Sequence, residues 1–192
     1  MNKRLTKRQK IELRQTTLKL IKNKSSRTNI ILSTLFFTGL ILTIFEINIY
    51  HDTIIDWKIP TAIWFFSGLL TLPFTSKYLV NYYSTTNIFM QLVFTITGFG
   101  GLLVFSFMAI NYYFSLDSRS EIIRTEILKT GHLAKGRNGC GNPYADVIIK
   151  SAEKELIFPC DFDIEKYKFV TLTVKRGLLG FDIVLDKKPS TE

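Results

Sequence analysis

The sequence predicts a membrane α-helical domain of three transmembrane helices, followed by a small C-terminal all-β domain of four to five antiparallel strands. Residues 1–28 are basic, with ten Lys or Arg and one Glu. Residues 29–114 hold only five charged residues and twelve of the sixteen Phe, which is not the surface of a soluble domain. In residues 115–192 apolar and polar residues alternate, and thirteen basic residues nearly balance twelve acidic ones. The net charge of +9 therefore belongs to the N-terminal tail, which weakens a nucleic-acid interpretation of the high pI.

Three apolar segments are predicted to cross a membrane, at residues 30–50, 59–80 and 88–114. The first has one charge in twenty-one positions. A helix rises ~1.5 Å per residue, so this run covers roughly the 30 Å of a hydrocarbon core. The third is longer than needed, which favours a tilt. The second has an alternative interpretation as a re-entrant or interfacial segment, because Pro60 and Pro73 bracket its apolar core.

The orientation follows from the basic tail. The first span is too long for a cleaved signal, and no small-x-small site follows it, so we expect an uncleaved signal anchor. Lys and Arg near a span are retained on the cytoplasmic side, which places the N-terminus inside the cytoplasmic (inner) membrane. Three crossings then place residues 115–192 outside. The predicted inner loop, residues 75–87, carries only Lys77, so the tail sets the orientation nearly alone.

Two interpretations of the tail stay open. Ile11, Leu18 and Ile21 recur at roughly helical spacing, which is typical of a basic amphipathic helix lying on an anionic membrane surface. The other interpretation is a solvated tail that only sets topology. No nucleic-acid-binding motif accompanies the charge, so nucleic acid is not an expected partner.

Polar and small residues within the spans raise two further hypotheses. Glu46 falls about 25 Å along the first helix, near the outer interface, and is either a carboxylate at headgroup level or a proton or ion site. Three helices are too few to enclose a transport pathway in a monomer. Gly98 and Gly101 lie on one helix face and are predicted helix-packing positions. Their partner is either the protein's own bundle or another subunit, so a homo-oligomer stays open.

The C-terminal domain is predicted to be a sandwich or a partly open barrel. Its expected strands are rich in Val, Ile, Thr and Phe, and lie at residues 144–150, 155–158, 168–176 and 181–186. Residues 121–129 are either a strand or an extension of the third helix. The sequence Gly-Leu-Leu-Gly at 177–180 predicts a hairpin turn, and residues 150–155 predict another. The small size of this domain limits its core.

The two cysteines, Cys140 and Cys160, are candidates for a disulfide because both lie in the domain expected outside. Closing a loop of about twenty residues would stabilise the domain by roughly 3 kcal/mol in the chain-entropy model. A metal site formed by these cysteines and His132 lacks the usual ligand spacing, and no metal or cofactor is expected.

The loop at residues 131–143 is rich in glycine and holds three candidate partner-contacting residues, His132, Lys135 and Arg137. An ordinary flexible connection explains the same composition.

No catalytic motif is present in the sequence. His51 beside Asp52 has no nucleophile motif, and the chain lacks G-x-S-x-G, H-E-x-x-H, a Walker loop and a dinucleotide fingerprint. We therefore expect a non-enzymatic membrane protein that is an accessory or scaffold subunit of a larger complex. Its expected partners are the lipid bilayer and other membrane protein subunits. The alternative is an immunity-type protein that binds and neutralises a membrane-active toxin.

Overall fold

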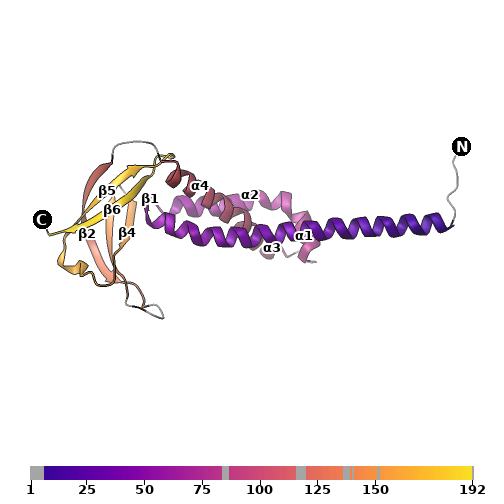
Figure 1. Ribbon diagram of the computed structural model, residues 1–192, viewed down its shortest axis with the longest axis horizontal. Helices are drawn as coiled ribbons and strands as arrows, with labels where there is room; N and C mark the ends of the chain where they lie inside the picture. Colours follow the sequence, from indigo (N-terminus) through magenta and orange to yellow (C-terminus); the bar gives the residue numbers. More distant parts are fainter. Residues whose placement is uncertain are drawn as a thin grey trace.

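The computed structural model describes residues 7–83, 87–115, 120–135, 139, 141–150 and 152–191. One end of the molecule is a helical bundle and the other is a β-domain (Figure 1). The helical part comprises α1 (Lys7–His51), α2 (Lys58–Tyr83), α3 (Ile88–Thr95), the π-helical segment η1 (Ile96–Gly100) and α4 (Gly101–Tyr113). The strands are β1 (Thr53–Ile54), β2 (Glu121–His132), β3 (Pro143–Ile149), β4 (Ala152–Ile157), β5 (Phe169–Arg176) and β6 (Asp182–Ser190), and a short 3₁₀ helix, η2 (Ile164–Lys166), precedes β5.

Three helical segments are long and apolar enough to span a membrane: Arg27–His51, Lys58–Val80 and Ile88–Tyr113. The three predicted apolar helices are thereby confirmed. The third is one continuous rod built from α3, η1 and α4, because each segment follows the last without a break.

Helix α2 is uninterrupted, which removes the basis for a re-entrant second segment. Pro60 lies in its first turn, where the missing N–H would have no helical partner anyway. Pro73 lies inside the helix and does not end it. The expected loop at 75–87 was wrong in extent, because α2 continues to Tyr83 through a stretch without glycine or proline.

Helix α1 is one helix of 45 residues, about 67 Å long. Figure 1 shows its N-terminal part continuing along the same axis, beyond the ends of the other helices. A helix lying flat on a membrane surface would require a bend between the basic segment and the first span. No break occurs between Lys7 and His51, so the basic segment projects along the axis of the span.

Close backbone contact between helices depends on glycines. A Cβ on Gly101 would lie 2.4 Å from the carbonyl oxygen of Gly39 in α1, and a Cβ on Gly100 would lie 2.5 Å from that of Trp64 in α2. A Cβ on Gly98 would make only ordinary contacts, the nearest at 3.5 Å to Phe36 Cα. The glycine-rich turn around η1 thus holds the third helix against both neighbours.

The β-domain is a nearly closed, six-stranded antiparallel barrel with strand order β1-β6-β5-β2-β3-β4. Five strands come from the C-terminal region, as expected, and residues 121–129 belong to a strand rather than to a helix. Val170, Leu172 and Val174 of β5 point into the core, because inward and outward residues alternate along a strand.

The sixth strand was not expected. Thr53 and Ile54, which connect α1 to α2, pair with Ile183 and Asp182 of β6, and Ile54 joins the core of the β-domain. The prediction of 150–155 as a turn was also too wide, because β4 begins at Ala152. The tight turn is at Lys150, whose φ of 49° is rare for a residue with a side chain. The turn at 177–180 is confirmed, and Gly180 has a φ of 89°.

Candidate functional site

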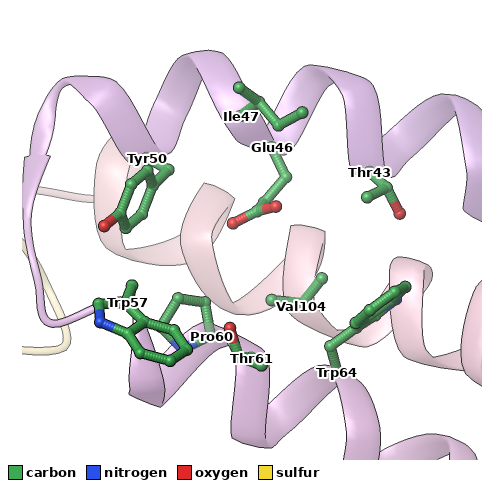
Figure 2. A pocket seen from close by; sticks show the side chains of 9 residues that line it. All are labelled: Thr43, Glu46, Ile47, Tyr50, Trp57, Pro60, Thr61, Trp64 and Val104. Atoms are coloured by element: carbon green, nitrogen blue, oxygen red, sulfur yellow. The ribbon is translucent and has the colours of Figure 1, made fainter.

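A pocket of about 210 Å³ lies between α1 and α2 near the end of the bundle that carries the β-domain (Figure 2). Two helices supply nearly all of its lining. The lining residues are Thr43, Glu46, Ile47 and Tyr50 of α1, Trp57, Pro60, Thr61 and Trp64 at the start of α2, and Val104 of α4.

Helical spacing explains why these residues converge. The four lining residues of α1 follow the pattern i, i+3, i+4, i+7, and the four at the start of α2 follow the same pattern. Such residues share one face of a helix. The short connection through β1 folds α2 back along α1, so the two faces meet.

Glu46 is the charged residue of the pocket. Its side chain points from α1 into the space between the two helices, toward α2 (Figure 2). Only 9% of the residue is exposed, and among the described residues its carboxylate has no hydrogen-bond or ion-pair partner. A buried carboxylate without a partner is costly, so this group is available for a ligand that brings a positive charge or a hydrogen-bond donor.

Aromatic rings surround the carboxylate. Tyr50 and Trp57 line the pocket toward the β-domain, and Trp64 lines it farther along α2 (Figure 2). The indole Nε1 of Trp64 is buried and has no hydrogen-bond partner among the described residues. Ile47 and Trp57, which border the pocket, are 49% and 59% exposed, so its mouth opens on the outer surface of the bundle.

The β-domain contacts the helices directly beside this pocket. The first of two main contacts is made by Asn111, near the end of α4. Asn111 is fully buried, and its Nδ2 donates to the Phe181 carbonyl at 3.1 Å while its Oδ1 accepts from the Leu179 amide at 3.1 Å. Its own carbonyl accepts from the Leu178 amide. One side chain thus secures the hairpin turn between β5 and β6.

Lys154 of β4 makes the second attachment. Its Nζ donates to the carbonyl of Tyr50, in the last turn of α1, and lies 4.0 Å from the centroid of the Tyr50 ring. An ammonium at this end of a helix also interacts favourably with the helix dipole. Burial lowers the pKa of Lys154 to about 8, although Asp52 and Glu155 act in the opposite direction.

A mixed apolar cluster completes the junction. Ile49 of α1, Ile55 of the α1–α2 connection and Met108 of α4 are buried together, and Phe181 of the hairpin packs against them. The Phe181 ring contacts the Phe107 ring edge to face at 5.8 Å between centroids. The Val184 amide of β6 also donates to the Asp52 carbonyl at 2.7 Å. Helices and barrel therefore share one packed interface.

The residues predicted to contact partners lie elsewhere. His132 ends β2 and Lys135 follows it, and both are exposed at the edge of the loop. Arg137 and Cys140 lie outside the described residues. Because Cys140 lies outside the described residues, the structure describes no disulfide pair, and the bond from Cys140 to Cys160 stays a prediction. Among described residues no group of His, Cys, Asp and Glu is arranged to hold a metal ion.

Sequence reasoning identified Glu46 but missed its surroundings. The repeated i, i+3, i+4, i+7 spacing of polar and aromatic residues in the two segments was the available signal. Asn111 and Lys154 carried no such signal, because their roles depend on contacts with residues far away in the chain.

Comparisons of the chain with protein-family models, with curated proteins and with solved structures found no match.

Proposed function

We propose that this protein is a non-enzymatic integral membrane protein that presents its β-domain outside the cytoplasmic membrane, as an accessory or scaffold subunit of a larger membrane complex. One observation carries the proposal: the β-domain is fixed to the apolar helices by β1, by Asn111 and by Lys154. A rigid mounting suits a presenting function, because a surface held in place loses less freedom when a partner binds.

The helices supply the reason for a membrane location. Large apolar side chains point outward along them, including Phe37, Phe66 and Phe74, which are 60%, 60% and 78% exposed. Exposed apolar surface on this scale is typical of a membrane or partner interface. Lipid chains solvate such side chains without cost.

The outer face of the β-domain offers a surface for a partner. Ile122 and Leu128 of β2 and Ile148 of β3 are 71%, 56% and 53% exposed. Arg124 lies between the first two on the same strand, with its guanidinium 4.4 Å from the centroid of the Phe169 ring. Apolar side chains together with Arg and an aromatic ring are typical of protein interfaces.

The orientation is tested by labelling Cys140 and Cys160 in intact cells with an impermeant thiol reagent, before and after reduction. We expect labelling only after reduction, because an oxidising outer compartment favours the disulfide. Labelling without reduction that requires broken cells would place the β-domain inside and refute the orientation.

The partner is tested by native purification of the full chain followed by mass spectrometry. We expect a stoichiometric set of membrane proteins, which the double variant Leu128→Lys/Ile148→Lys loses. Leu185→Lys, at a 56% exposed position on β6, is the matched control and should retain them. A protein that purifies alone argues against a subunit role.

The immunity-type alternative has its own signature in the same experiment. The protein would then purify alone, and cells without it would become sensitive to a membrane-active toxin. A stoichiometric complex and unchanged sensitivity would exclude this alternative.

A further inference from the structure

We infer that the pocket between α1 and α2 binds the ammonium headgroup of a zwitterionic phospholipid, with the ammonium at Glu46. This inference rests on the proposed membrane location but not on which protein the β-domain contacts. It begins from the carboxylate of Glu46, which belongs to a residue only 9% exposed, points into the pocket and has no hydrogen-bond or ion-pair partner among the described residues.

A carboxylate binds a cation, and the residues around Glu46 indicate which kind of cation fits. A bare metal ion such as Ca²⁺ takes six to eight oxygen ligands, whereas this pocket offers one carboxylate and two threonine hydroxyls. The Thr43 hydroxyl already donates to the Gly39 carbonyl at 2.9 Å. By contrast, Trp57 and Trp64 supply two aromatic rings near the carboxylate, and Tyr50, whose ring already has the Lys154 ammonium 4.0 Å from its centroid, lines a third side. Rings of this kind attract organic ammonium groups.

The Trp64 indole bounds the pocket with its ring, because its Nε1 has almost no accessible surface and is out of reach of a ligand there. A zwitterionic phospholipid carries the ammonium that Glu46 and the rings favour, together with acyl chains that the exposed apolar side chains beside the pocket would contact.

The depth of the pocket fits a headgroup. Glu46 precedes the end of the apolar segment at His51 by five residues, which is about 7.5 Å along a helix. Beyond a hydrocarbon core of ~30 Å, headgroups extend a bilayer to ~40–45 Å, so this level is the boundary between chains and headgroups. The mouth beside Ile47 and Trp57 opens on the bundle surface, where the acyl chains of the lipid would lie.

The test is native mass spectrometry of the full chain in detergent with an equimolar mixture of phosphatidylethanolamine and phosphatidylglycerol of identical chains. We expect one retained lipid, with the zwitterionic form preferred about tenfold. Glu46→Gln keeps the shape of the side chain and should reduce the preference to about one. Glu153→Gln, at an exposed position on β4, is the matched control and should keep it.

The two tryptophans of the chain both line the pocket, so their fluorescence gives a second measurement. Short-chain phosphatidylethanolamine should shift the emission of the wild type at concentrations where phosphatidylglycerol does not. Trp64→Leu removes one ring and keeps an apolar side chain, so it should bind the same lipid severalfold more weakly and retain the headgroup preference.

Three results would overturn the inference. The first is equal retention of the two lipids by the wild type. The second is an unchanged preference in Glu46→Gln with native secondary structure. The third is displacement of the lipid by an equal concentration of free ethanolamine, which would assign the site to a soluble amine. A failure of the membrane proposal looks different: the chain would stay monodisperse without detergent and retain no lipid.

Discussion

Lys154 is a charged residue at a position that excludes water almost completely. It is 2% exposed, yet its ammonium has the Tyr50 carbonyl and ring as partners. An ammonium held in this way links β4 to the end of α1. If β4 separated from α1, water would solvate the Lys154 ammonium. The titration of Lys154 therefore reports whether β4 and α1 are in contact.

The lowered pKa of Lys154 makes stability depend on pH in a defined window. The folded value is about 8 and the ordinary value is 10.5, so between them the unfolded chain binds more protons. Stability should therefore rise as pH increases from 8 to 10.5, with a contribution of at most about 3 kcal/mol from this group. The check is the unfolding temperature of the full chain in detergent at pH 7.5 and pH 10.

Lys154→Met should remove this contribution, whereas Lys188→Met, whose side chain is 78% exposed, should leave it unchanged. Lys187, whose pKa burial also lowers, keeps a smaller response of the same sign in both variants. Identical pH responses in the wild type and Lys154→Met would show that Lys154 is not buried as described.

At the scale of elements, the crossing of α1 and the third helix depends on one glycine more than on its neighbour. Gly101→Ala places a methyl group 2.4 Å from the Gly39 carbonyl oxygen and 2.6 Å from Thr43 Oγ1, so the helices must separate. We expect a loss of about 1–3 kcal/mol, seen as a lower unfolding temperature. Gly98→Ala meets only ordinary contacts and should be neutral or slightly stabilising, since alanine favours helix. Equal effects of the two substitutions would contradict this crossing.

The side-chain amide of Asn111 makes two of the hydrogen bonds that attach the β5–β6 hairpin to α4. Asn111→Leu leaves the Leu179 N–H and the Phe181 carbonyl without this partner, at a cost of about 2–3 kcal/mol. We expect faster proteolysis at residues 177–181 as the hairpin detaches.

Ser106→Ala in the same helix removes only a hydrogen bond to the Leu102 carbonyl and is the matched control. Its cleavage rate should equal that of the wild type. If Asn111→Leu were cleaved no faster than this control, the backbone bond from Leu178 and the Phe181 contacts would hold the hairpin without the Asn111 side chain, which would contradict this role.

The sequence predicts the long helices and the long strands, but it does not predict strand β1 or the whole pocket. Long apolar runs and alternating strands are visible because their periodicity is local. Strand β1 has two residues, too few for any period, and gains its pairing only from β6. The pocket between α1 and α2 was partly predictable from Glu46 and from helical spacing, but the convergence of two helix faces depends on how β1 turns the chain.

At the scale of the whole molecule, the attachments combine into one rigid body. Strand β1 places the α1–α2 connection in the barrel, Asn111 fixes the hairpin to α4, and Lys154 fixes β4 to α1. The barrel is thus tied to three helices, α1, α2 and α4. A partner that binds the β-domain would meet a surface held at a constant height and angle above the bundle.

Hydrogen exchange of the full chain in detergent micelles tests this rigid unit most directly. We expect the segment 52–55 to exchange as slowly as β6, with the Val184 amide, which donates to the Asp52 carbonyl, among the protected groups. Exchange of 52–55 at the rate of an open loop, while β5 stays protected, would show that the barrel is only tethered to the helices and is not rigidly mounted on them.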